Sequence, residues 1–257
     1  MTAPIAIRPD GTRRAVTRTW VPEVPVALEF NGLSYAVMMA TPQDLEDFAT
    51  GFALNEGLAS HPSDVTDLAV AEVAQGWIVR ASLSGLGIDK LTDRVRRRVA
   101  ESSCGLCGIE NLAEVARPLP PVATHAPIDP QAIFAALGQL RDRQTLARQT
   151  EAAHAAAWVA PDGRIGLIRE DVGRHNALDK LVGAMARAGQ PLAPGFVLST
   201  ARCSFEIVEK AVRGGATTLV TLSLPTSMAV ERAAAAGLSL WALARADEVT
   251  LVNDASA

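Results

Sequence analysis

The sequence predicts an α/β protein in two parts, a smaller α+β part followed by a larger α/β part. Three observations predict this. Two hairpin signals flank a helical segment before residue 84, a proline-rich stretch divides the chain, and apolar segments then alternate with helical segments. Such alternation indicates a largely parallel sheet covered on both faces. With 257 residues, the chain can bury one large core or two small ones.

The N-terminal part, residues 19–117, follows a polar segment over residues 1–18 that we expect to form a flexible arm. Asn-Gly and Gln-Gly pairs between apolar segments predict two hairpins. A Thr-Pro pair between them predicts a helix with proline in its first turn. The predicted elements are strands 24–30 and 33–39, a helix from Thr41-Pro42 carrying Leu45, Phe48 and Phe52, strands 65–74 and 77–83, and an arginine-rich helix over 89–100.

Two of the three cysteines, Cys104 and Cys107, form a Cys-x-x-Cys pair. Such a pair can bind a metal, exchange disulfides or carry sulfur as a persulfide, and each use needs a thiolate. Residues 109–116 have apolar residues at helical spacing, so the thiols precede a helix N-terminus, which favours an anion. Nucleophilic sulfur chemistry is favoured, and disulfide exchange stays open.

Zinc is disfavoured at this pair. A structural zinc ion commonly takes four ligands, and the other candidates are Cys203 and four isolated histidines. A zinc deaminase combines Pro-Cys-x-x-Cys with His-x-Glu, whereas serine precedes Cys104 and the chain has no His-x-Glu. We therefore expect no metal site.

Composition excludes several classes of protein. The net charge of −4 does not favour nucleic acid, and no apolar run reaches the roughly 18 residues that span a membrane. Three cysteines suit a reducing compartment better than a disulfide framework. We expect a cytoplasmic protein with neither nucleic-acid nor membrane partners.

A proline-rich connector over residues 118–128 leads to the C-terminal part, residues 129–257. Asp129-Pro130 predicts a helix start, and Pro161-Asp162-Gly163 predicts a hairpin turn. The predicted elements are a helix from residue 129 that includes Leu140, strands 155–160 and 164–169, helix 176–188, strand 196–199, helix 205–213, strand 218–222, helix 227–236 and strand 238–243.

Polar loops follow three of these strands, at residues 170–176, 200–204 and 223–227. Ligands of open α/β sheets bind beyond the carboxyl ends of the strands. Each loop opens a helix, so Arg174, Arg202 and the helix N-termini could converge on a phosphate or pyrophosphate. A second interpretation stays open, in which His175 is a hydrogen-bonded residue at a helix start and the others are ordinary N-caps: Asp171, Asn176, Ser204 and Thr226.

Four segments resemble the formate dehydrogenase accessory sulfurtransferase family, also called FdhD: residues 41–57, 102–108, 169–183 and 202–211. The resemblance extends from about residue 20 to residue 252. It implies a cytidine-deaminase-like three-layer α/β/α sandwich with a mixed sheet and no catalytic zinc, beside the smaller N-terminal α+β subdomain.

The resemblance also implies a function. A cysteine desulfurase would place sulfur on Cys104 as a persulfide, with Cys107 as an assisting thiol. The sulfur would pass to the molybdenum bis-molybdopterin guanine dinucleotide cofactor before that cofactor enters formate dehydrogenase. The family suggests a homodimer. Two alternatives are a non-catalytic molybdenum-cofactor chaperone and a thiol–disulfide redox protein.

On this reading the cofactor-binding residues are Arg174, His175, Arg202, Thr226, Leu243, Ala244, Arg245, Ala246, Asp247 and Glu248. The chain departs from the family pattern near several of them, at Glu151, Ala152, Ala201 and Leu224. Side chains in place of glycines would restrict the backbone there, so cofactor binding is a weaker expectation than sulfur carriage. The sequence indicates no role for Cys203.

Overall fold

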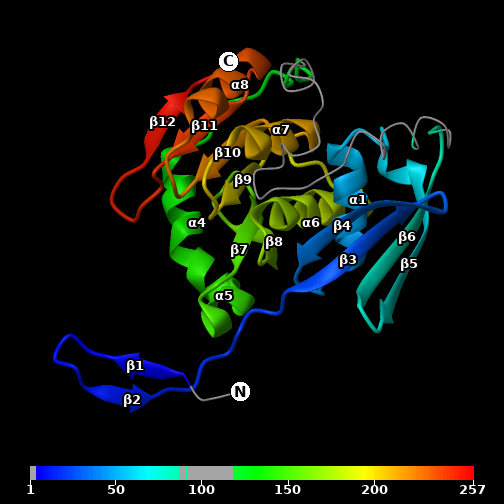
Figure 1. Ribbon diagram of the computed structural model, residues 1–257. Coiled ribbons are helices and arrows are strands. Elements are labelled where there is room, and N and C mark those ends of the chain that lie inside the picture. The colour runs from blue at the N-terminus through cyan, green and yellow to red at the C-terminus, as the bar shows by residue number, and fades with distance from the viewer. Residues whose placement is uncertain (1–3, 87–90, 92–117) are drawn as a thin grey trace.

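A computed structural model describes residues 4–86, 91 and 118–257 of the chain. Figure 1 shows two sheets side by side, with helices between them. The smaller sheet has the strand order β4-β3-β6-β5 and contains one parallel pair, β3 with β6. Its elements are β3 (Val24–Phe30), β4 (Leu33–Ala40), α1 (Leu45–Asn55), the 3-10 turn η1 (Pro62–Asp64), β5 (Val65–Val73) and β6 (Gly76–Leu83).

The larger sheet has six strands in the order β12-β11-β10-β9-β7-β8. Strands β9, β10 and β11 are parallel, whereas β12, β7 and β8 join through antiparallel pairs. Its elements are α4 (Pro130–Arg143), α5 (Thr145–Thr150), β7 (His154–Val159), β8 (Ile165–Asp171), α6 (Arg174–Arg187), β9 (Phe196–Ser199), α7 (Phe205–Arg213), β10 (Thr218–Thr221), α8 (Ser227–Ala236), β11 (Ser239–Ala242) and β12 (Thr250–Asn253).

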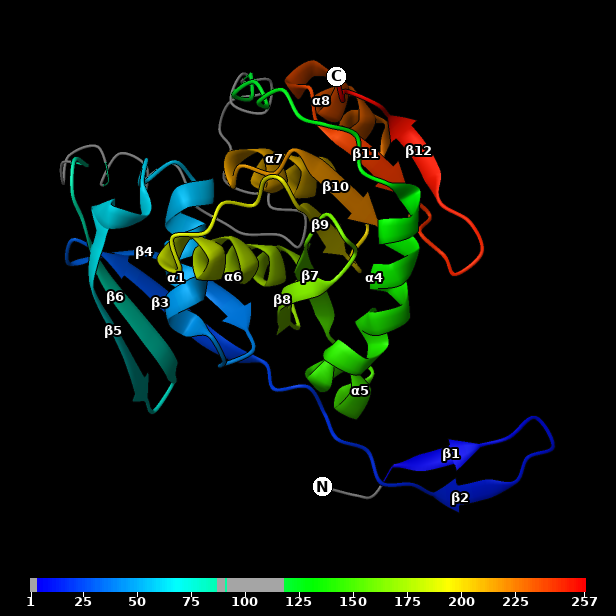
Figure 2. The ribbon, with the colours of Figure 1, turned by 180° about the vertical axis from the view of Figure 1, so that it is seen from behind.

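Helices cover both faces of this larger sheet (Figures 1 and 2). Successive strand residues alternate between the two faces, as strand geometry requires. Val197 and Leu219 belong to the core under α6, α7 and α8, whereas Leu198 and Val220 belong to the core under α4. A three-layer α/β/α arrangement results. Within it the mixed sheet is confirmed, and the cytidine-deaminase-like assignment stays a prediction.

The structure corrects four expectations. The sheet is mixed and not largely parallel, because the chain turns back at the β7–β8 hairpin. Helix α1 begins at Leu45 after Asp44, so Thr41-Pro42 does not open it. Part of the arm forms a two-stranded hairpin, β1 (Ile5–Ile7) with β2 (Arg13–Ala15), which the polar composition concealed. Short α5 and β12 were not predicted from periodicity.

Helices α1 and α6 hold the two sheets together. They approach closely at Gly51 and Gly183, where an added Cβ would lie 1.8 Å from the Asp179 carbonyl oxygen and 1.9 Å from that of Asp47. Only glycine fits such a contact. Arg169 then donates to Asp47 at 2.9 and 2.8 Å.

A buried ion pair fixes the loop that leads into α6. Lys180 Nζ lies 2.6 Å from Asp171 Oδ2, and both side chains are inaccessible to solvent. Lys180 also donates to the Thr41 carbonyl at 2.9 Å, and Thr41 N donates to Asp171 Oδ2 at 3.0 Å. Asn176 Nδ2 donates to Asp171 Oδ1 at 3.0 Å. Thr41, predicted to start a helix, instead ties the end of β4 to the end of β8 and to Lys180 in α6.

Candidate functional site

The polar loops predicted from the sequence lie along one edge of the larger sheet. Strand β7 is antiparallel to both β8 and β9, so β8 and β9 run in the same direction, and β10 and β11 run parallel to β9. The loops after β8, β9, β10 and β11 therefore leave the same edge, where α6, α7 and α8 begin. The first residue of β7, His154, pairs with Asp171 at this edge as well.

The N-terminus of α6 places Arg174 and His175 at this edge. Gly173 precedes the helix, and an added Cβ there would meet the Asn176 side-chain nitrogen at 2.7 Å. Asn176 is buried, and its amide also donates to the Met39 carbonyl at 2.9 Å. The alternative interpretation of Asn176 as an N-cap is wrong, because Gly173 is the N-cap of α6 and Asn176 lies inside the first turn, where its amide bonds to Asp171 and Met39.

The N-terminus of α7 brings Arg202 and Ser204 to the same edge. Arg202 is exposed in the loop between β9 and α7. Ser204 occupies the N-cap position of α7, yet its hydroxyl makes no capping hydrogen bond. The loop is joined to the next one, because Thr226 N donates to the Cys203 carbonyl at 3.0 Å.

Thr226 behaves differently from Ser204. Its hydroxyl accepts a hydrogen bond from Ala229 N at 3.3 Å, so it caps α8. The loop after β11 is partly exposed, and Arg245 N donates to the Glu248 carbonyl at 2.8 Å within it. The remaining predicted residues of this loop are Leu243 in a left-handed conformation, buried Ala244 in the core under α4, and exposed Ala246 and Asp247.

Positive charge gathers around His175. Burial, followed by the charges of Lys210, Arg174 and His154, lowers the pKa of His175 to about 3. The pKa of His154 is lowered by burial and then by Arg174 and Arg202. Both imidazoles are therefore neutral near pH 7, and a bound anion would be attracted by the arginines.

Among the described residues, two polar atoms at this edge are buried without a hydrogen-bond partner: His175 Nε2 and Ser204 Oγ. Each such atom loses its hydration without gaining a bond, which costs about 1–3 kcal/mol. Buried polar atoms are usually satisfied, so an unsatisfied pair at the carboxyl edge of a sheet indicates a missing ligand. A hydrogen-bonding anion fits both atoms and the surrounding arginines.

Two of these residues, His154 and Ser204, were absent from the predicted cofactor site. His154 begins a strand, and a largely parallel sheet would put that end at the opposite edge. The antiparallel direction of β7 brings it to the site. Lys210 was also missed, because it lies along α7 and not in a loop.

The departures from the family pattern have different structural consequences. Glu151 has φ 55°, a left-handed conformation that favours glycine, and its carboxylate accepts from Arg18 at 3.1 Å. Ala152, Ala201 and Leu224 have no positive φ, so their side chains do not strain the backbone. Ala201 is buried, while Leu224 is 60% exposed. The restriction expected from lost glycines thus applies at Glu151.

Cys104 and Cys107 lie outside the described residues, as does the helix predicted after them. Of the helix predicted over 89–100, Leu91 is described, and it is helical and fully buried in the core of the smaller sheet. The third cysteine, Cys203, is fully buried, and burial raises the pKa of its thiol to about 11. Cys203 is therefore a protonated core residue and a poor nucleophile.

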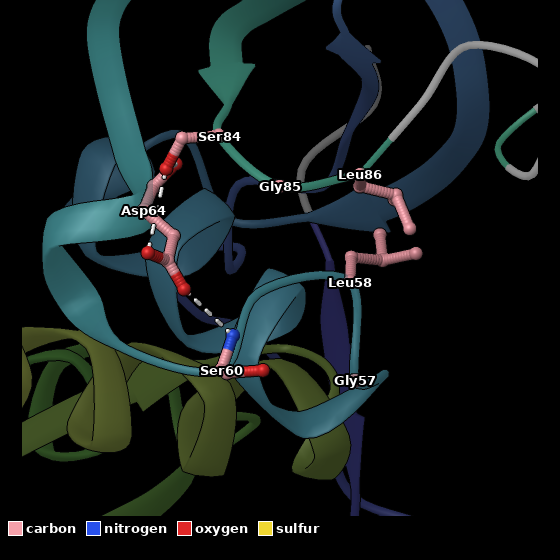
Figure 3. A pocket seen from close by; sticks show the side chains of 7 residues that line it. All are labelled: Gly57, Leu58, Ser60, Asp64, Ser84, Gly85 and Leu86. Carbon is pink, nitrogen blue, oxygen red and sulfur yellow. Dashed lines mark hydrogen bonds between the residues drawn. The ribbon is translucent and has the colours of Figure 1, made fainter.

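A separate hollow of about 210 Å³ lies beside the smaller sheet (Figure 3). Its one charged lining residue, Asp64, accepts hydrogen bonds from Ser60 N at 3.0 Å and His61 N at 2.8 Å. These backbone bonds lower the pKa of Asp64 and occupy its carboxylate. Among the described residues, those that line the hollow are Gly57, Leu58, Ser60, Asp64, Ser84, Gly85 and Leu86, and none of these was predicted as a site residue.

The described residues contain neither a cluster of metal-ligand type nor a helix able to cross a membrane. Within residues 4–86, 91 and 118–257, no cluster of three His, Cys, Asp or Glu side chains is arranged to hold a metal ion. No helix in this part of the chain combines the length and apolar character needed to cross a membrane.

Comparisons with known proteins agree on one family. The FdhD/NarQ family model matches residues 21–256. "Sulfur carrier protein FdhD" of Cupriavidus necator is 47% identical over 224 residues, covering 87% of this chain and 78% of that protein. The protein of the same name from Variovorax paradoxus is 43% identical over 235 residues, covering 91% and 84%.

One solved structure shares the fold. It is a crystal structure from Desulfotalea psychrophila, assigned as a formate dehydrogenase accessory protein. It superimposes with a TM-score of 0.75 and covers 98% of this chain and 96% of that chain. The two sequences are 23% identical, so this likeness concerns the fold.

Proposed function

The chain belongs to the FdhD/NarQ family, and we propose that it carries sulfur from a cysteine desulfurase to the molybdenum cofactor of a formate dehydrogenase. The relatives named as sulfur carriers support the first part of this proposal. The observation that supports an anionic acceptor is the edge of the larger sheet, where His175 Nε2 and Ser204 Oγ are buried without partners among arginines.

The sulfur is carried on Cys104. Its thiolate attacks the outer sulfur of the desulfurase persulfide, so that a new S–S bond forms on Cys104 and the desulfurase thiolate leaves. The thiolate of Cys107 can then attack the inner sulfur, which forms a Cys104–Cys107 disulfide and releases sulfide for the metal. A dithiol reductant must reopen that disulfide before the next cycle.

The acceptor is a substrate of this protein. Its pyrophosphate groups would be bound by Arg174 and Arg202, with Ser204 Oγ donating to a phosphate oxygen. Neutral His175 can donate from Nε2 in one tautomer, which would satisfy this buried atom. Thr226 already caps α8, so we expect it to shape the loop and to contact the acceptor less strongly.

Mass spectrometry of the intact protein tests sulfur carriage. After incubation with a cysteine desulfurase and cysteine, the wild-type protein should gain one sulfur atom that a reductant removes. Cys104→Ala should lose this adduct, whereas Cys203→Ala should keep it, because the Cys203 thiol is buried and protonated.

The other outcomes identify the alternatives. A folded wild-type protein that gains no sulfur beside an active desulfurase would support the cofactor-binding chaperone. A reversible Cys104–Cys107 disulfide without labile sulfur would support the thiol–disulfide protein.

Binding of inorganic pyrophosphate tests the acceptor site separately. Arg202 is exposed, so Arg202→Ala should leave the fold unchanged. We expect it to weaken pyrophosphate binding about tenfold or more, since a hydrogen bond to a charged group contributes about 1.5–3 kcal/mol. Titration calorimetry measures this directly. Equal affinities for the variant and the wild type would move the acceptor away from this edge.

A further inference from the structure

The arm hairpin, formed by β1 and β2, stands apart from the rest of the protein. Its two strands pair with each other and form a sheet of their own. Figures 1 and 2, seen from opposite sides, both show the arm hairpin clear of the smaller sheet and of the larger sheet. An isolated two-stranded hairpin is marginally stable in water. This one therefore needs a surface to pack against.

One face of the arm hairpin is apolar. Ile5 lies opposite Ala15, and Ile7 lies opposite Arg13, so these four residues share a face. Ile5 and Ile7 are 57% and 64% exposed. The hairpin thus presents two large aliphatic side chains to solvent, with an arginine beside them.

The smaller sheet has a partly exposed apolar row on the face away from α1. Its members are aligned across all four strands by the register of β4, β3, β6 and β5: Val37, Ala27, Ile78 and Ala71. Val37 is 54% exposed, and Met39, two residues along β4, is 48% exposed. We call Met39 and these four residues the outer row.

We propose that the arm hairpin of one copy of this chain packs on the outer row of a second copy, in a reciprocal exchange. Each copy then places its arm hairpin on the outer row of the other copy. The same contact occurs twice, as two-fold symmetry requires, and it covers the apolar face of the hairpin and the outer row in both copies. The exchange would also provide a structural basis for the homodimer suggested by the family resemblance.

Charge favours a second copy as the occupant. The arm over residues 1–18 has four arginines and one aspartate, a formal charge of +3, and the whole chain has −4. The remaining residues therefore carry −7. Two arm hairpins repel each other, whereas an arm hairpin is attracted to the acidic body of another copy.

The position of the arm favours exchange over packing within one chain. Arg18, which follows the hairpin, donates to Glu151 at the end of α5 at 3.1 Å. This contact holds the arm beside the larger sheet, and the figures show the arm hairpin beyond α5 and away from β5 and β6. The outer row of the same chain is consequently left open.

Sedimentation equilibrium of the full-length chain tests the proposal. We expect a dimer that Ile7→Asp in the arm, or Met39→Asp in the outer row, weakens at least about tenfold, because each places a charge in an apolar contact. Leu251→Asp is the matched control, since Leu251 is 41% exposed on β12, outside both surfaces. It should dimerise like the wild type, and circular dichroism should confirm that all three variants fold.

A mixing experiment distinguishes exchange from other dimers. An Ile7→Asp dimer retains no intact contact, and neither does a Met39→Asp dimer. A mixture of the two pairs an intact arm hairpin with an intact outer row once, so it should form a heterodimer tighter than either variant alone. A monomeric wild type, a dimer insensitive to both substitutions, or a mixture no tighter than the single variants would overturn the proposal.

Discussion

Two neighbouring residues at the start of α6 differ in how their buried polar atoms are satisfied. Asn176 donates to both Asp171 and Met39, within a network in which Lys180 and Asp171 form a buried ion pair. His175 has a buried Nε2 atom with no partner. Asn176 bonds to the last residues of β4 and β8, whereas the charges that act on His175 come from Lys210 on α7, Arg174 on α6 and His154 on β7.

Whether a buried polar atom has a hydrogen-bond partner distinguishes structural groups from groups that are available to a ligand. A buried group that is fully bonded stabilises one arrangement of the chain, and removing its partner is costly. A buried group without a partner already costs stability in the free protein. That cost is recovered when a ligand supplies the missing hydrogen bond. Three measurements test this contrast between bonded and unpartnered buried polar groups.

The largest effect is expected on the bonded side. Lys180→Met removes the cation from a fully buried pair and leaves Asp171 charged without it. We expect a loss of about 3–5 kcal/mol in the free energy of unfolding. Urea denaturation measures it, and the double variant Asp171→Asn/Lys180→Met should recover part of the loss. A loss below about 1 kcal/mol would mean that the network does not hold the α6 loop.

The sequence predicted the positions of the polar loops in the C-terminal part well. A short apolar strand, a few polar residues and then a helical segment form a pattern that can be recognised without the structure. It predicted strand 196–199 and helices 205–213 and 227–236 with the bounds that the structure has. It did not predict which polar residue is satisfied. Asn176 and His175 look alike as helix-start residues, and the tertiary hydrogen bonds of Asn176 to Met39 O and Asp171 distinguish them.

The turn at Pro161-Asp162-Gly163 predicted the β7–β8 hairpin, which the structure confirms. Sequence periodicity did not predict that β7 also pairs antiparallel with β9, because alternating strands and helices indicate parallel neighbours. His154 reaches the site through this reversal, which depends on pairing between distant strands. Cys104 and Cys107 were identified from their spacing, and their chemical role stays a prediction.

The second largest effect is the pH dependence of the free energy of unfolding that His175 causes. The pKa of His175 is about 3 in the folded protein, below the ordinary value of 6.5. As the pH falls below 6.5 the unfolded chain binds this proton and the folded chain does not, so stability is lost down to about pH 3. Above pH 6.5 the contribution is fully present.

His175→Gln removes this titration and keeps a neutral polar side chain. Between pH 6.5 and 4.5, wild type should lose about 2–3 kcal/mol more unfolding free energy than the variant, at about 1.4 kcal/mol per pH unit. Urea titrations at both pH values measure the difference, and all other titrating groups are shared. Equal losses in the two proteins would show that His175 is not held neutral by its surroundings.

The smallest effect compares two hydroxyls at equivalent positions. Thr226 caps α8 by accepting from Ala229 N, whereas Ser204 sits at the same position of α7 and caps nothing. Thr226→Ala should therefore cost about 1 kcal/mol of stability. Ser204→Ala should not lower stability and should raise it by up to about 1–3 kcal/mol, because it loses no hydrogen bond and removes a buried hydroxyl that lacks a partner.

Pyrophosphate binding should rank the two variants in the opposite order. Ser204→Ala should weaken binding about tenfold, since it removes one of the two buried groups at this edge that lack a partner in the described part of the chain, and Thr226→Ala should weaken it less. Thermal unfolding and titration calorimetry on the same two proteins measure both quantities. If Ser204→Ala destabilises the protein as much as Thr226→Ala and binds pyrophosphate normally, Ser204 is a structural residue. Anion binding at this edge of the larger sheet would then depend on His175 and the arginines, without Ser204.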